Sequence, residues 1–126
     1  MKFEHLIEIN DLLNPLMDTI TREQLWRGLV LRAESPKLFV PQLDEATIDQ
    51  KSDAGFRRRL RYGKLEVLDH VRLTPMEKVH YAVPQQGEIA PSSLTMAIEA
   101  PAEDRLFVRF TYEDGLDPAS ESATER

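Results

Sequence analysis

The sequence contains no cysteine. This absence excludes disulfides, thiol catalysis, thiolate metal sites and iron–sulfur clusters, and it fits a cytosolic compartment. No stretch approaches the roughly 18 apolar residues needed to span a bilayer, and the N-terminus lacks the long apolar segment of a signal peptide. We therefore expect a soluble, cytoplasmic protein that does not insert stably into a membrane.

Positive charge is in the minority, with 16 lysines and arginines against 22 acidic residues and a net charge of −6. Such a chain is not attracted over long range to nucleic acid or to anionic membranes. The exception is an arginine cluster at positions 57, 58, 59 and 61. Because successive strand side chains point to opposite faces, a strand divides this cluster between two faces. We expect no nucleic-acid partner.

Motifs for metal and cofactor binding are also absent. His5, His70 and His80 fall in separate predicted strands and lack the short spacing of metal ligands. The sequence has no glycine-rich phosphate loop, nucleophile elbow or paired-carboxylate motif. We expect neither a metal nor a cofactor.

The pattern of apolar and polar residues predicts a short helical region followed by strands. Residues 2–9 alternate, with Phe3, His5 and Ile7 on one side, as in a half-buried strand. Thr21 and Gln24 fit a capping box that begins a helix over residues 22–32, and a short second helix is predicted over 36–40. Six more strands are predicted over residues 47–51, 55–62, 65–73, 77–83, 93–99 and 105–113.

This order of elements predicts an α+β fold in which two short N-terminal helices accompany a seven-stranded, curved antiparallel sheet. The length of 126 residues is enough for one domain with one core. We expect that domain to occupy residues 1–113. Residues 114–126 are polar and are expected to form a disordered tail.

The most informative segment is a hairpin over residues 55–73. Gly63-Lys64 predicts a two-residue type II′ turn, because glycine stands first in the loop. The turn sets the strand register, and side chains of one parity then share one face. The facing pairs on that face are Tyr62 with Leu65, Leu60 with Val67, Arg58 with Asp69, and Phe56 with Val71.

One charged pair, Arg58 and Asp69, therefore falls on an otherwise apolar face. Such a pair costs desolvation unless it is well matched. If residues 74–76 form the next loop, Tyr81 faces Asp69 and extends the polar row. The row is either the polar end of a ligand site or a structural pair that sets the register.

Other residues are candidates for a functional role. His5 lies on the apolar side of the first strand, where it is either a proton shuttle or a core residue. Asp69 is the other acid–base candidate. Trp26 lies on the predicted helix and either stacks on a planar ligand or packs in the core. Phe39 and Val40 could flank a pocket entrance.

The opening residues 1–10 (MKFEHLIEIN), the helix motif 21–29 (TREQLWRGL) and the run 32–36 (RAESP) are similar to AtaL-like proteins. These proteins are a branch of the SRPBCC, START-like or Bet v 1-like superfamily. The resemblance covers residues 1–113. It implies the helix-grip fold, with a hydrophobic cavity between the sheet and the long C-terminal helix of the superfamily. Members of the superfamily bind lipids, sterols, hormones or polyketides, and some catalyse cyclisation or dehydration.

The sequence departs from the superfamily in one respect, because no segment corresponds to its long C-terminal helix. Either the sequence as given lacks that helix or the sheet is covered in another way. A bare apolar face exceeds what monomers normally expose, so a homodimer is a further expectation.

We interpret the chain as a binder of an apolar or aromatic metabolite, lipid-like or polyketide-like. One alternative is a cyclase- or dehydratase-like enzyme using Asp69 or His5 as acid–base. Another is a non-enzymatic protein-interaction domain. The expected ligand-binding residues are Arg58 and Asp69 for a polar group, with Phe56, Leu60, Tyr62, Val67, Val71, Tyr81 and Trp26 around the apolar part.

Overall fold

The β3–β4 hairpin forms as its turn predicts. In the computed structural model, which describes residues 2–9, 20–102 and 105–114, β3 (Gly55–Tyr62) and β4 (Leu65–Thr74) pair in the expected register. Gly63 has a φ of 62° and is followed by Lys64, which has no positive φ, as a type II′ turn requires. Arg58 therefore lies directly opposite Asp69.

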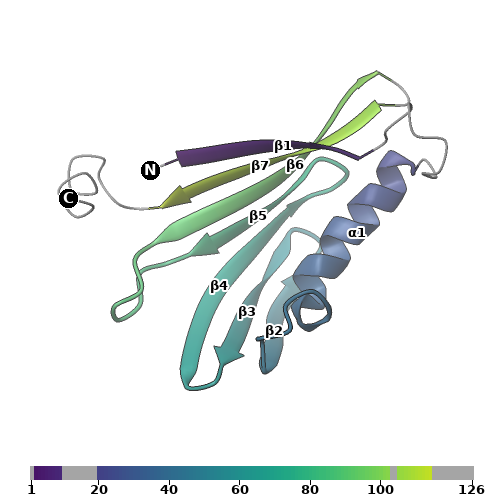
Figure 1. Cartoon of the computed structure of the whole chain (residues 1–126). Coiled ribbons are helices and arrows are strands. Elements are labelled where there is room, and N and C mark those ends of the chain that lie inside the picture. Colours follow the sequence, from purple (N-terminus) through teal and green to yellow (C-terminus); the bar gives the residue numbers. More distant parts are fainter. Residues whose placement is uncertain (1, 10–19, 103–104, 115–126) are drawn as a thin grey trace.

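The described strands form one antiparallel sheet of seven strands, in the order β1-β7-β6-β5-β4-β3-β2 (Figure 1). This confirms the predicted fold class. The remaining strands are β1 (Lys2–Glu8), β2 (Glu45–Ser52), β5 (Lys78–Val83), β6 (Ser92–Ala102) and β7 (Arg105–Asp114). β7 thus includes Asp114, the first residue of the predicted tail, and residues 115–126 lie outside the described residues.

The helix α1 (Arg22–Glu34) begins at the predicted capping box. The Gln24 backbone N–H donates to Thr21 Oγ1 at 3.1 Å, and the Thr21 N–H donates to Gln24 Oε1 at 2.8 Å. The predicted second helix is only a single 3₁₀ turn, η1 (Pro36–Leu38). Apart from α1 and η1, no described residue is helical.

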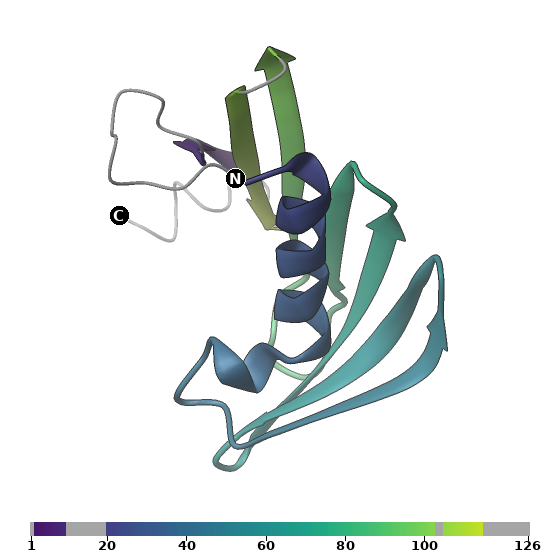
Figure 2. The ribbon, with the colours of Figure 1, turned by 90° about the vertical axis from the view of Figure 1, so that its right-hand side faces the viewer.

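The core lies between α1 and the concave face of the sheet, which curves around the helix (Figure 2). Leu25, Leu29 and Ala33 recur along α1 at helical spacing, so they share the face that packs on the sheet. The sheet residues of this hydrophobic core cluster are Phe56, Val71, Val79, Tyr81, Met96, Ile98, Leu106 and Val108.

Strand β1 is not half-buried as its alternation predicts, since every residue of β1 is exposed. It is an edge strand paired only with β7 among the described strands. Residues of α1 pack against β5 and β6 in the middle of the sheet, so α1 does not cover β1. Phe3, on the concave side, is 58% exposed.

The register predicted between β4 and β5 is wrong by two residues. Tyr81 lies opposite Val71 rather than Asp69, because the three-residue loop spans 75–77 instead of 74–76. Pro75 takes the second position of a turn in which the Glu77 N–H donates to the Thr74 carbonyl. Met76 then adopts a φ of 64°. A shift of two residues leaves Tyr81 on the concave face.

We predict that Gly55→Ala lowers the free energy of unfolding by about 2–4 kcal/mol. Gly55 has a φ of 152°, and an added Cβ would lie 2.1 Å from the Val71 carbonyl oxygen, inside the β3–β4 ladder. Urea denaturation measures the loss.

Gly28→Ala is the matched control, because a Cβ at this helical position meets nothing within 4 Å. It should raise the free energy of unfolding by about 0.5–1 kcal/mol. Equal stability of Gly55→Ala and the wild type would contradict the close approach of the two strands.

Candidate functional site

The arginine and aspartate at the centre of the concave face are buried and bind each other. Arg58 is 7% and Asp69 6% exposed. Arg58 Nε donates to Asp69 Oδ1 at 2.8 Å, and its Nη2 donates to Asp69 Oδ2. Both carboxylate oxygens therefore accept a hydrogen bond from the guanidinium fork, the bidentate geometry of the strongest ion pairs.

The third nitrogen of Arg58 reaches the helix. Nη1 donates to the Ala33 carbonyl oxygen at 3.1 Å, in the last turn of α1. The last carbonyls of a helix have no partner within the helix, so Arg58 satisfies one of them while neutralising Asp69. The side chain joins β3, β4 and α1, which makes it structural whatever else it does.

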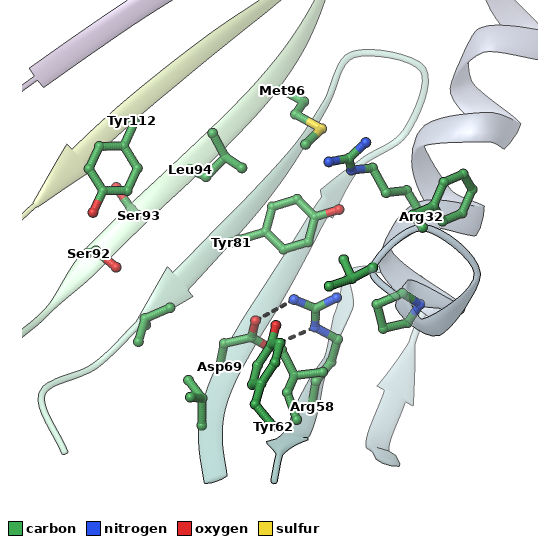
Figure 3. A pocket seen from close by; sticks show the side chains of 16 residues that line it. Arg32, Arg58, Tyr62, Asp69, Tyr81, Ser92, Ser93, Leu94, Met96 and Tyr112 are labelled. Carbon is green, nitrogen blue, oxygen red and sulfur yellow. Dashed lines mark hydrogen bonds and ion pairs between the residues drawn. The ribbon is translucent and has the colours of Figure 1, made fainter. Parts of the chain in front are cut away.

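A cavity of about 340 Å³ opens beside this pair, between the concave face, η1 and the end of α1 (Figure 3). Its charged lining residues are Arg32, Arg58 and Asp69. The rest are apolar or neutral: Pro36, Phe39, Val40, Leu60, Tyr62, Val67, Tyr81, Val83, Ser92, Ser93, Leu94, Met96 and Tyr112.

Tyr81 is the unusual residue of this lining. Its ring lies under the Arg58 guanidinium, whose Cζ is 4.9 Å from the ring centroid. Its hydroxyl oxygen is buried and has no hydrogen-bond partner among the described residues. Burial raises the pKa of Tyr81, and the neighbouring charges of Arg58 and Arg32 offset part of that rise. The phenol is therefore protonated at neutral pH and can donate.

The structure gathers six of the nine expected ligand-binding residues around the cavity: Arg58, Leu60, Tyr62, Val67, Asp69 and Tyr81. Phe56 and Val71 do not line it, because they are 1% and 0% exposed beneath α1. Trp26 packs against the core instead. Phe39 and Val40 line the cavity beside η1.

His5 is not brought to this site. It lies on β1, four strands from β4 in the sheet order, a separation of roughly 19 Å at the usual strand spacing. Its side chain is exposed and pairs across the sheet with Phe110. The structure thus separates the two acid–base candidates, and Asp69 is engaged by Arg58.

Sequence reasoning missed Arg32, Leu94, Met96 and Tyr112. The three sheet residues share the parity of Tyr81 through the pairs Tyr81–Leu94 and Leu94–Tyr112. An alternation count on β6 and β7 would have placed them on the concave face. Arg32 follows Leu25 and Leu29 at helical spacing, which places it on the sheet-facing side of α1, but its position at the cavity depends on how α1 crosses the sheet.

A second hollow of about 480 Å³ lies on the convex face, along β3, β4 and β5. Charged and exposed side chains form much of it, including Arg57, Arg59, Asp49 and His70. His80, also on this face, is half-buried, and its Nδ1 lies 2.7 Å from Thr95 Oγ1. Burial, with Arg72 and Lys78, lowers the pKa of His80.

Two further features are missing from the described residues. No group of three or more histidine and acidic side chains there could hold a metal ion. No helix there is long and apolar enough to cross a membrane.

The family model described as "Acetylaranotin biosynthesis cluster protein L" (AtaL) matches residues 7–126. No curated protein sequence matches the chain. Several solved structures share its fold. The di-domain ARO/CYC StfQ from the steffimycin biosynthetic pathway aligns with a TM-score of 0.69 and 8% identity, over 94% of this chain. The alignment covers 38% of StfQ, so the chain spans well under half of that protein.

Two other structures align over more of their own length. PFC0360w, an HSP90 activator from Plasmodium falciparum, has a TM-score of 0.58 and 16% identity, covering 98% of this chain and 85% of its own. Ara h 8.0201 has a TM-score of 0.59 and 14% identity, covering 99% of this chain and 87% of its own. At these identities the matches show the helix-grip fold alone.

We predict that Arg58→Met and Asp69→Leu each cost about 3–5 kcal/mol of unfolding free energy, because each leaves one buried charge without its partner. The double variant should lose much less than the sum of the two losses. Urea denaturation of the four proteins measures this coupling. Additive losses would contradict a direct pair, whereas a shared loss identifies one.

Proposed function

The chain belongs to the AtaL family, and we propose that it binds an apolar or aromatic small molecule, lipid-like or polyketide-like, in the cavity on the concave face. The observation that carries this proposal is the buried Tyr81 hydroxyl without a partner in an otherwise largely apolar lining. A few polar groups set among apolar walls are typical of small-molecule sites. The fold shared with the ARO/CYC StfQ is consistent with such a ligand.

The contacts favour binding over acid–base catalysis. Both oxygens of Asp69 accept hydrogen bonds from Arg58, so this carboxylate is held in a structural pair. His5 stands four strands away. Of the two acid–base candidates for the cyclase- or dehydratase-like alternative, only Asp69 lines the cavity, and its contacts with Arg58 give it a structural role.

We predict that the protein binds N-phenyl-1-naphthylamine, a neutral aromatic probe whose fluorescence rises in apolar sites, and that Leu94→Trp weakens this binding at least about tenfold. Leu94 is half-buried and lines the cavity (Figure 3), so an indole there fills the space of the probe. Fluorescence titration measures the affinity, and circular dichroism checks that the variant is folded.

Leu68→Trp is the matched control, because Leu68 is exposed and lines the convex hollow. It should leave the affinity for the probe unchanged. The reverse pattern, with binding lost only in Leu68→Trp, would move the ligand site to the convex face.

A second candidate function, protein interaction, is favoured by the edge strand β1. All its residues are exposed, and it carries apolar side chains on both faces, with Leu6 43% and Ile7 37% exposed. Bare apolar edge strands tend to pair with another strand. We propose that a second copy of the chain pairs with the free edge of β1.

The charges of β1 suit self-pairing. When two antiparallel copies are centred on His5, Lys2 of each lies opposite Glu8 of the other. Phe3 then lies opposite Ile7 on the concave side. Such a two-fold contact joins two sheets edge to edge.

We predict a concentration-dependent dimer that Phe3→Lys shifts to monomer, since the new charge falls opposite Ile7 of the other copy. Sedimentation velocity measures the distribution. Leu65→Lys is the control, because Leu65 is 52% exposed at the far hairpin and Phe3 is 58% exposed. A wild-type monomer at every concentration would contradict pairing through β1.

A further inference from the structure

The formal charges of the side chains that line the cavity do not sum to zero. Its charged lining residues are two arginines and one aspartate, which leaves one positive charge. Arg58 and Asp69 neutralise each other, so the unbalanced group is Arg32. A positive cavity stands out in a chain whose net charge is −6.

Arg32 lies in the last turn of α1 and is exposed at the cavity. It forms no ion pair with a described residue, and its Cζ lies 5.9 Å from the Phe39 ring centroid. Figure 3 shows its side chain extending from α1 on the side of the Tyr81 hydroxyl. The two groups are close enough for the charge of Arg32 to act on the ionisation of Tyr81.

Tyr81 offers the complementary half of a site. The Tyr81 hydroxyl group can donate a hydrogen bond. It is buried, and no described residue accepts a hydrogen bond from it. A buried polar group without a partner costs free energy. A ligand oxygen that accepts from Tyr81 removes this cost, and an anionic oxygen also gains the charge of Arg32.

We propose that the cavity selects apolar molecules carrying an anionic oxygen, bound by the Tyr81 hydroxyl and the Arg32 guanidinium. The inference rests on the proposed ligand-binding function and narrows its ligand class to acids. It also changes the roles expected from the sequence. Arg58 and Asp69 shape the site, and the polar anchor lies at Arg32 and Tyr81.

The test compares 2-naphthoate with 2-naphthamide, which have the same ring and nearly the same shape but differ in charge. Calorimetric titration of the wild type should give about tenfold tighter binding of the carboxylate, the gain of one charge-assisted hydrogen bond. Arg32→Gln should bring the two affinities to within about twofold of each other, because the carboxylate no longer gains the charge of Arg32.

Tyr81→Phe keeps the ring under Arg58 and removes only the hydroxyl. It should weaken 2-naphthoate binding about fivefold without lowering the unfolding midpoint, because the hydroxyl has no partner in the protein. Arg27→Gln makes the same charge change on the same helix away from the cavity, so it should keep the preference.

The three probes distinguish a failure of the proposed selectivity for acids from a failure of the proposed ligand binding. Equal binding of both naphthalenes, or an unchanged preference in Arg32→Gln, overturns the selection of acids and leaves ligand binding intact. The same holds if neither naphthalene binds but N-phenyl-1-naphthylamine does. Absence of binding by all three probes overturns the proposed function together with this inference.

Discussion

The buried pair of Arg58 and Asp69 is the constraint on which the rest of the structure depends. A charge of either sign alone on the concave face would be costly, so β3 and β4 must hold the register that brings the two together. Arg58 also donates to the Ala33 carbonyl, which fixes the end of α1 above the hairpin. One side chain thereby sets the relation of two strands and a helix, and the cavity lies beside it.

The hydrogen bonds of Arg58 and Asp69 within the protein limit which polar groups of the cavity are free to bind a ligand. Arg58 donates three of its five N–H groups within the protein, two to Asp69 and one to the helix. Hydrogen-bonding capacity remains at Tyr81 and Arg32, whose partners are missing among the described residues. The most conspicuous polar residues in the sequence are thus supports, and the groups proposed to contact a ligand are less conspicuous.

Local signals explain which features the sequence predicts correctly. The β3–β4 register depends on a turn of only two residues, Gly63-Lys64. The capping box that begins α1 is equally local, because it involves only Thr21 and Gln24. The predicted β4–β5 register is wrong because the residues around Pro75 allow two loops of equal length, and the choice between them depends on the turn position of Pro75 and on tertiary contacts. One such contact is the Arg22 Nε donating to the Met76 carbonyl at 2.8 Å. Arg32 could not be assigned, since no local pattern fixes how α1 crosses the sheet.

A single cross-strand row explains why the cavity lies where it does. The row runs from Phe56 through Val71, Tyr81, Leu94 and Tyr112 to Phe3. Exposure is 1% at Phe56, 7% at Tyr81, 39% at Tyr112 and 58% at Phe3. Because α1 covers only the first part, the row passes from core to open surface, and the cavity forms at the transition. The fold alone does not decide which ligand the proposed site would accept, so that choice would rest on the few polar side chains at this transition.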